Sequence, residues 1–489
     1  MSSQREPHEN PAGMSPEEFR VYGHELIDWA ADYLADPRRF PVLPDVEPGD
    51  IRDALPRHAP ERAESMDEIL RDFDRIIVPG STLWNHPRFL AYFANTGSAP
   101  GILGELIAAT LNINAMLWVT GPAETELEEV ATGWLRDAMG LPATFEGTIN
   151  DTASSSTLYA LAAAREYAYD LRIRAEGLAG RSDVPPLRIY CSEEAHSSVD
   201  KAALTLGLGR AGIRRIRVDA DLRMDADVLA DAVAEDIANG VRPIAVVGTV
   251  GTTSTTAVDP IPAIADVCEE HDLWLHVDAA YAGPAALLEE KMWIMDGCER
   301  AHSLVTNPHK WLLTPMDCSI LYTRLPETLR EAFSLTPEYL TTTTQARNLM
   351  DYGNSLGRRF RALKLWFVLR RYGLEGVRSV LREHIRIAEQ VEAWIRAEPD
   401  FEMLAPREFS VVAFRYKPAR TDEPTIDALN AALLRRINEE REFYMSHTRV
   451  NGKYALRIAI GNAMTEERDL AELWSELLRV ARSLKPADV

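Results

Sequence analysis

The order of apolar and polar residues predicts a helical arm at the start of the chain. Ser15 and Glu18 form a capping box with Pro16 at the first helical position, and apolar residues then follow at helical spacing. A second amphipathic helix is expected over residues 66–77, after a proline-bearing extended connector over residues 40–60. Two helices with little between them form no core of their own. We therefore expect this arm to bury its apolar stripe elsewhere, on a partner subunit.

Short β-branched runs alternate with alanine-rich helical stretches from about residue 105 to residue 323. The expected strands are residues 187–190, 213–218, 244–247, 274–277, 303–305 and 319–322, and the helices between them include residues 158–166 and 261–270. This alternation predicts an α/β domain around a mostly parallel sheet. Ligands of such a sheet bind beyond the carboxyl ends of its strands.

The last part of the chain predicts a smaller α+β domain. A long helix is expected over residues 361–396, followed by strands over 410–415, 443–448 and 454–460 and helices over 425–439 and 466–484. We therefore expect three parts, which are an N-terminal helical arm over residues 1–97, a large α/β domain over 98–370 and a small α+β domain over 371–489.

Composition and charge narrow the functional classes. Hydrophobic residues make up 46% and charged residues 26% of the chain, as in ordinary globular proteins. The 53 basic and 75 acidic residues give a net charge of −22, which repels phosphate backbones, so we expect no nucleic-acid partner. No apolar run approaches the roughly 18 residues of a membrane span, and the polar N-terminus lacks the apolar core of a signal peptide. The four cysteines include no CxxC pair. We expect a cytoplasmic protein with reduced thiols, no membrane contact and no metal site.

Two residues have the chemistry that a pyridoxal phosphate enzyme needs. Asp278 ends the expected strand 274–277, and Lys310 follows the expected strand 303–305. A carboxylate can hold a proton on a pyridine nitrogen, and a lysine amine in an apolar setting can attack an aldehyde. Taken singly, Asp278 is as readily a helix cap, and a lone lysine is usually a solvated charge. Together the two residues favour the catalytic interpretation.

A phosphate cradle and a platform for the ring are expected near the same sheet edge. The hydroxyl-rich segment 152–157 precedes an apolar helix, where free N–H groups and the helix dipole favour an anion. His196 follows the strand 187–190 and can stack on a planar ring, and the segment 248–253 supplies hydroxyl groups after another strand. Each feature alone is also typical of a cap, a loop or an ordinary histidine. Their convergence on several strand ends predicts one site.

Four segments together resemble the group II pyridoxal-phosphate-dependent decarboxylases, especially the aromatic-L-amino-acid decarboxylases. They are AHSSVDKA (195–202), GTVGTTS (248–254), HVDAAYAG (276–283) and NPHKW (307–311). The similarity extends from about residue 14 into the C-terminal region. It implies a cytoplasmic homodimer of fold type I, which is the aminotransferase-like fold, with pyridoxal 5′-phosphate as cofactor and an N-terminal arm that embraces the partner.

The resemblance implies a role for each residue of the cofactor site. Lys310 is implied to bind the cofactor covalently, Asp278 to contact the pyridine nitrogen and His196 to stack on the ring. Phosphate contacts are implied for Ala153, Ser154 and Asn307, a position near the phenolic oxygen for Thr253, and packing on the ring face opposite His196 for Ala280.

The resemblance also implies the reaction, in which an aromatic amino acid loses CO2 and is released as an amine. Tyr339 in the segment LTPEYL (335–340) matches the proton-donating tyrosine of the family, with a packing or turn role as the alternative, and His309 is expected to relay the proton. Relatives that convert aromatic amino acids oxidatively into aldehydes typically carry phenylalanine there, so Tyr339 favours simple decarboxylation. A non-catalytic scaffold homologue is expected to have lost Lys310, Asp278 or His196, and all three are present.

Substrate positions are implied as well, with core packing as the alternative for the aromatic ones. The implied set is Trp84, Tyr92, Phe93 and Asn95, together with Asn114, Met116 and Gly357 from the neighbouring subunit. Ala94, Asn95, Asn114 and Met116 replace a proline, a threonine, an isoleucine and a phenylalanine of the common animal pattern. Gly357 accompanies bulky indole or catechol rings in the relatives and disfavours histidine. The choice among tryptophan, phenylalanine, tyrosine and DOPA stays open.

Overall fold

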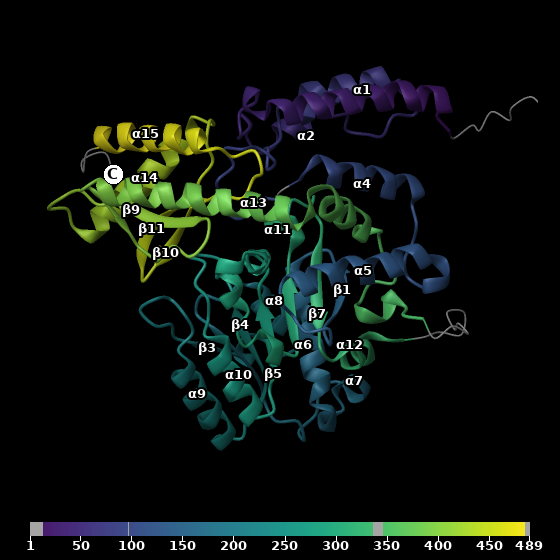
Figure 1. Ribbon diagram of the computed structural model, residues 1–489, viewed down its shortest axis with the longest axis vertical. Helices are drawn as coiled ribbons and strands as arrows, with labels where there is room; N and C mark the ends of the chain where they lie inside the picture. Colours follow the sequence, from purple (N-terminus) through teal and green to yellow (C-terminus); the bar gives the residue numbers. More distant parts are fainter. Residues whose placement is uncertain (1–12, 96, 336–345, 485–489) are drawn as a thin grey trace, which may run out of the picture.

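The computed structural model describes residues 13–95, 97–335 and 346–484 of the 489-residue chain. Two sheets organise it: a seven-stranded sheet and a four-stranded antiparallel sheet (Figure 1). The large sheet occupies the lower half of the molecule in this view, and the small sheet lies above it, towards the C-terminus. This architecture confirms the predicted α/β fold with a small C-terminal α+β part.

The large sheet has the strand order β1-β7-β6-β5-β4-β2-β3. Its strands are β1 (Glu146–Asn150), β2 (Leu187–Ser192), β3 (Ile213–Ile216), β4 (Arg242–Thr249), β5 (Trp274–Asp278), β6 (Ser303–Thr306) and β7 (Ser319–Thr323). Strands β2 to β6 pair in parallel, whereas β7 runs antiparallel to both β6 and β1. All but β1 overlap an expected strand. The sequence of β1, EGTIN, has a single β-branched apolar residue, and the strand exists through its pairing with β7.

Helices cover both faces of the large sheet. Their bounds are α5 (Pro122–Ala138), α6 (Ala153–Tyr167), α7 (Ile173–Glu176), α8 (Ser198–Thr205), α9 (Ala226–Ala238), α10 (Ile261–Glu270), α11 (Pro308–Trp311) and α12 (Pro326–Phe333). Side chains of α5, α9 and α10 share one core with the sheet, and those of α6 and α8 share another on the opposite face. Because both faces are covered, residues 243–249 of β4 are all buried, which explains the apolar runs in the sequence. Across the described ranges, none of the helices is long and apolar enough to cross a membrane.

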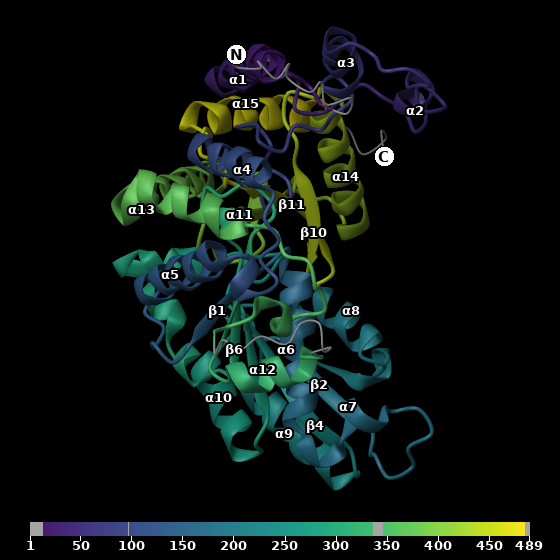
Figure 2. The same ribbon diagram turned by 90° about the vertical axis from the view of Figure 1, so that its right-hand side faces the viewer.

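Helix α13 (Arg361–Ala397) connects the two sheets and packs beside α4 (Ala99–Leu111) (Figure 2). It kinks at Gly373, where φ is 63°, a conformation that favours glycine. The small sheet has the order β10-β11-β9-β8. Its elements are β8 (Phe401–Met403), β9 (Val411–Tyr416), β10 (Ser446–Val450), β11 (Lys453–Ala459), α14 (Glu423–Glu439) and α15 (Glu467–Ser483). The short strand β8 was not predicted.

The N-terminal arm contains α1 (Pro16–Ala35), α2 (Asp50–Ala54) and α3 (Met66–Asp72), which a π-helical turn over Phe73–Ile77 extends. The capping box is present, because the Ser15 hydroxyl accepts from the Glu18 N–H at 3.1 Å and the Glu18 carboxylate accepts from the Ser15 N–H at 2.9 Å. The presence of α2 corrects the prediction of a wholly extended connector. None of these three helices has a buried residue within the chain.

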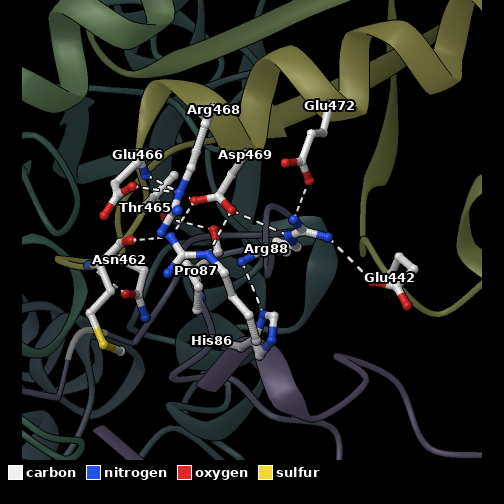
Figure 3. Close-up of polar contacts among 12 residues, drawn as sticks. His86, Pro87, Arg88, Glu442, Asn462, Thr465, Glu466, Arg468, Asp469 and Glu472 are labelled. Carbon is white, nitrogen blue, oxygen red and sulfur yellow. Dashed lines mark hydrogen bonds and ion pairs between the residues drawn. The ribbon is translucent and has the colours of Figure 1, made fainter. Parts of the chain in front are cut away.

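A buried carboxylate fastens the end of the arm to the small domain. Asp469 begins α15 with no exposed side-chain surface, and it accepts hydrogen bonds from Arg38 Nε at 2.9 Å and Arg38 Nη2 at 2.7 Å. Arg88 Nε donates to the same carboxylate at 3.2 Å, and Figure 3 shows Arg88 also reaching Glu442 and Glu472. These contacts fix the position of Arg38 and Arg88 of the arm relative to α15.

Candidate active site

The carboxyl ends of three parallel strands meet at one edge of the large sheet. In the register, Thr249 at the end of β4 lies beside Asp278 at the end of β5, and Asp278 lies beside Val305 of β6. Asn307 follows β6 directly and is the N-cap of α11, and Lys310 lies within α11. A cavity of about 380 Å³ lies at this edge, and residues of β10 and β11 from the small sheet complete its wall.

The cavity brings together the residues expected to bind the cofactor. Those that line it are Ala153, Ser154, His196, Thr253, Asp278, Ala280, Asn307, His309 and Lys310. They come from four separate strand ends and the start of α6, as the order of strands in the sheet requires. Tyr339, the expected proton donor, lies outside the described residues.

Lys310 combines an accessible position with a depressed pKa. Its side chain is partly exposed to the cavity, and its Nζ lies 5.0 Å from the centre of the Phe93 ring. Burial lowers the pKa of Lys310, the positive charge of Arg457 lowers it further, and the carboxylate of Asp278 opposes both effects. A larger share of this amine is therefore neutral and nucleophilic than in an exposed lysine.

Two histidines in the wall are neutral and have a defined tautomer. His196 Nδ1 accepts from the Ser198 N–H at 3.1 Å, and burial lowers the pKa of this ring. His309 Nδ1 accepts from the Cys318 N–H at 2.9 Å, and burial, together with the charge of Lys310, lowers its pKa to about 3. Because Nδ1 is an acceptor in each case, the single proton of each neutral ring lies on Nε2.

The wall has the polar groups that pyridoxal phosphate requires. Ala153 and Ser154 occupy the first turn of α6, where backbone N–H groups have no partner within the helix and favour an anion. Thr249 Oγ1, a buried oxygen of the wall, has no hydrogen-bond partner among the described residues, and the side-chain amide of Asn307 lies 3.3 Å from His309 Nε2. Unpaired buried polar atoms are costly, so they indicate a polar ligand at this place. An anion cradle, a carboxylate and a lysine in one cavity fit this cofactor.

An aromatic wall lies beside Lys310. The ring centres of Trp84 and Tyr92 are 5.8 Å apart and nearly parallel, and the Phe93 ring stacks on Tyr281 at 4.0 Å. Trp84, Tyr92, Phe93 and Asn95 all line the cavity. Asn95 Nδ2 lies 3.4 Å from the sulfur of Met316, another residue of the wall.

Asn114, Met116 and Gly357 do not line this cavity. The Arg358 N–H donates to Asn114 Oδ1 at 3.0 Å, so the segment that contains Gly357 lies against Asn114. These residues were expected to serve the site of the neighbouring subunit. That role in a neighbouring site stays a prediction.

Several wall residues were missed by the sequence reasoning, above all residues of the small domain. These are Ser254, Met316, Ser446, His447, Thr448 and Arg457. A signal existed for Arg457, because it interrupts the apolar run of the expected strand 454–460. The local sequence pattern does not show that this strand reaches a cavity at the edge of the large sheet.

Comparisons with known proteins agree with this geometry. The family model described as the pyridoxal-dependent decarboxylase conserved domain matches residues 48–417. Tyrosine decarboxylase 4 of Petroselinum crispum is 39% identical over 480 residues, which cover 95% of this chain and 93% of the relative. Phenylacetaldehyde synthase of Arabidopsis thaliana is 38% identical over 473 residues, which cover 94% and 95%. The crystal structure of Oryza sativa TDC with PLP and tryptamine matches with a TM-score of 0.92 at 35% identity, covering 96% of this chain and 99% of that one. The chain therefore belongs to the pyridoxal-dependent decarboxylases, and pyridoxal phosphate is its cofactor.

Proposed function

We propose that this protein removes the carboxylate of an aromatic L-amino acid as CO2 and releases the corresponding arylalkylamine. The observation that carries this proposal is a single cavity lined both by Lys310 and Asp278 and by the aromatic side chains Trp84, Tyr92 and Phe93. Relatives whose names specify tyrosine and tryptophan support an aromatic substrate. Tryptophan, phenylalanine, tyrosine and DOPA are the candidates.

Each side chain of the cavity has a distinct role in the proposed reaction. When bound, pyridoxal phosphate supplies an aldehyde that condenses with amines and a ring that accepts the electron pair left by the departing carboxylate. Lys310 would bind the aldehyde, and Asp278 would hold a proton on the pyridine nitrogen, which keeps the ring electron-poor. Ala153, Ser154 and Asn307 would hold the phosphate.

The remaining residues orient the ring and move the proton. His196 and Ala280 would hold opposite faces of the cofactor ring, and Thr253 would lie near its phenolic oxygen. Tyr339 donates a proton to the α-carbon after CO2 has left, and His309 relays it. The relay uses His309 Nε2, because its Nδ1 already accepts from the Cys318 N–H.

Oxidative aldehyde synthesis is the second candidate, because phenylacetaldehyde synthases are about as similar to this chain as the tyrosine decarboxylases are. Tyr339 favours the amine. Tyr339→Phe keeps an aromatic side chain but lacks the phenolic proton, so dioxygen and water would divert the product towards aldehyde, ammonia and peroxide. Amine formation at the wild-type rate in this variant, with no aldehyde under air, would show that Tyr339 is not the donor.

A direct test is product analysis by mass spectrometry after the holoenzyme has been incubated with each of the twenty amino acids and with DOPA. We expect an arylalkylamine and CO2 from at least one aromatic amino acid, and no amine from histidine. Turnover of an aliphatic or acidic amino acid in preference to all aromatic ones would overturn the proposed substrate class. An aldehyde as the main product would favour the second candidate.

We further propose a cytoplasmic homodimer divided into an arm (1–97), a large domain (98–370) and a small domain (371–489). Exposed apolar residues of α1, including Phe19, Val21, Leu26 and Ile27, support an arm that packs on a second copy. Met116 and Gly357 then complete the partner's substrate site. Sedimentation at working concentration tests this assembly, and full activity in a strictly monomeric sample would contradict it.

A further inference from the structure

Arg457 is a buried cation in the wall of the cavity. It lies on β11 with 3% of its surface exposed, and it is one of the small-domain residues that line the site of Lys310. Its Nε donates to the Ser254 carbonyl oxygen at 3.2 Å and its Nη1 donates to the Tyr92 carbonyl oxygen. Its Nη2 is buried and has no hydrogen-bond partner among the described residues.

The charge of Arg457 is not neutralised by an acidic side chain. Its hydrogen bonds go to backbone carbonyl groups, and no carboxylate in the described parts of the chain forms an ion pair with it. The other buried arginines behave differently: Arg358 binds Glu128, and Arg415 binds Glu402 and Glu423. Burying a charge without an ionic partner costs free energy. Because no carboxylate neutralises Arg457, its positive charge acts on the neighbouring groups.

The ring of Phe93 is a shared neighbour of Arg457 and Lys310. The guanidinium carbon of Arg457 lies 4.7 Å from the ring centre, and Lys310 Nζ lies 5.0 Å from the same centre. Tyr281 stacks on Phe93 at 4.0 Å, so apolar rings occupy the surroundings of both cations. Coulomb interactions are stronger across such a medium than across bulk water, because its dielectric constant is lower.

We propose that Arg457 is a positioning residue that favours the neutral, nucleophilic form of the Lys310 amine. Its uncompensated positive charge disfavours a second cation at Nζ, and Phe93 holds the two groups at the distance where this repulsion acts. The inference rests on the proposed function in one respect, which is that Lys310 is the residue that condenses with the cofactor aldehyde. A lysine beside another cation is a known way to obtain a reactive amine at neutral pH.

The other titratable groups around Lys310 do not replace this effect. Burial is the largest cause of the lowered pKa of Lys310, and Asp278 at the end of β5 acts in the opposite direction, since its carboxylate favours the ammonium form. His196 and His309 carry no charge at neutral pH, because burial lowers the pKa of both rings. Tyr281 donates to or accepts from Ser410, and burial raises the pKa of this phenol, so it too is neutral. Arg457 is therefore the cation that opposes Asp278.

A purely structural role for Arg457 must be separated from this electrostatic one. Its bond to the Tyr92 carbonyl helps to hold a residue whose φ is 50°, and the Tyr92 N–H donates to Ser446 Oγ at 3.2 Å. Arg457→Met keeps an unbranched side chain without the charge. Arg457→Lys keeps the charge but loses the forked donors that reach Ser254 and Tyr92. The two variants therefore lose different properties.

The experiment measures how fast the apoenzyme binds pyridoxal phosphate covalently as a function of pH, from the rise of the visible absorbance of the imine. The two distances to the Phe93 centre place the cations no more than about 10 Å apart, and at an effective dielectric constant of about 20 two unit charges at that separation change a pKa by roughly one unit. In Arg457→Met we expect the midpoint of the rate profile to rise by about one pH unit, which makes capture about tenfold slower at neutral pH. In Arg457→Lys we expect a midpoint close to that of the wild type.

Two results would overturn the proposal. One is an unchanged midpoint in a folded Arg457→Met protein, with folding checked by circular dichroism and by the melting temperature. The other is a raised midpoint in Arg457→Lys, because this variant keeps the positive charge. This result would overturn the proposal even if the methionine variant does not fold. Borohydride reduction followed by peptide mapping keeps this test separate from the proposed function, because a cofactor attached to a lysine other than Lys310 would refute the function itself.

Discussion

Trp311 Nε1 donates a hydrogen bond of 2.9 Å to Nδ1 of His384. Trp311 directly follows Lys310 in the chain, and His384 belongs to α13, the helix that connects the two sheets. His384 Nε2 lies 3.0 Å from the carbonyl oxygen of Asn462. Because Nδ1 accepts, the proton of the neutral ring lies on Nε2 and is donated to Asn462. This imidazole therefore links the segment of the reactive lysine to the C-terminal region, and it does so only when it is neutral.

The first prediction follows from the pKa of His384, which burial lowers from 6.5 to about 4. Between these two values the unfolded chain binds a proton that the folded chain does not, so stability falls as the pH drops through this window. The loss for this residue alone is roughly 3 kcal/mol. We expect His384→Gln to flatten the dependence of the free energy of unfolding on pH between about 6.5 and 4, measured by urea denaturation. An equal slope in the variant would contradict the neutral state of His384.

A second prediction concerns the acid at the end of β5. Asp278→Asn keeps the shape of the side chain but removes the charge that, in the proposed function, holds a proton on the pyridine nitrogen. We expect the variant to bind pyridoxal phosphate and to show the visible absorbance of the imine, while kcat falls about 10²- to 10³-fold, as when other electrostatic stabilisers are removed. A variant with wild-type kcat would exclude this role for Asp278.

The third prediction concerns the covalent attachment of the cofactor. Borohydride should fix the pyridoxyl group on Lys310 in the wild type, as identified by peptide mass spectrometry. Lys310→Ala should lose turnover and the protein-bound imine, because no other amine occupies its place beside Phe93 and Asp278 in the wall. Equilibrium dialysis should still detect non-covalent binding, since the N-terminus of α6 and Asn307 remain. Turnover comparable to the wild type would refute the assignment.

The fourth prediction concerns the buried ion cluster at the start of α15. Burial alone raises the pKa of Asp469, but the hydrogen bonds from Arg38, the Glu466 N–H and Arg88 outweigh burial and hold it below its usual value. Asp469→Asn leaves two arginines without their shared carboxylate, so we expect the free energy of unfolding to fall by about 3–5 kcal/mol. Urea denaturation measures the loss.

The matched control is Glu442→Gln, because Glu442 contacts the same Arg88 but its side chain is 62% exposed. Exposed pairs contribute about 0–1 kcal/mol, so this variant should unfold like the wild type. Limited proteolysis should cleave the N-terminal arm faster in Asp469→Asn than in Glu442→Gln. Equal losses of stability in the two variants would show that Asp469 does not fasten the arm.

Local patterns were sufficient wherever the structural signal lies in consecutive residues. Helix α10 has the predicted bounds, Ile261–Glu270, because its apolar residues repeat at helical spacing behind Pro260. The central strands of the large sheet were predictable because both faces are buried, which requires apolar runs. Strand β1 was not, since its five residues are a strand only through their pairing with β7, more than 150 positions away.

The sequence by itself determined the α/β class, the strand ends that present Asp278 and Lys310, and the family, because each of these depends on short segments read in order. Only the tertiary structure decided that Arg457 shares the ring of Phe93 with Lys310, and that Met116 and Gly357 lie outside the cavity of Lys310. These relations join residues that are far apart in the chain. They arise from how two sheets and a kinked connecting helix pack together, and no local period or spacing encodes that packing.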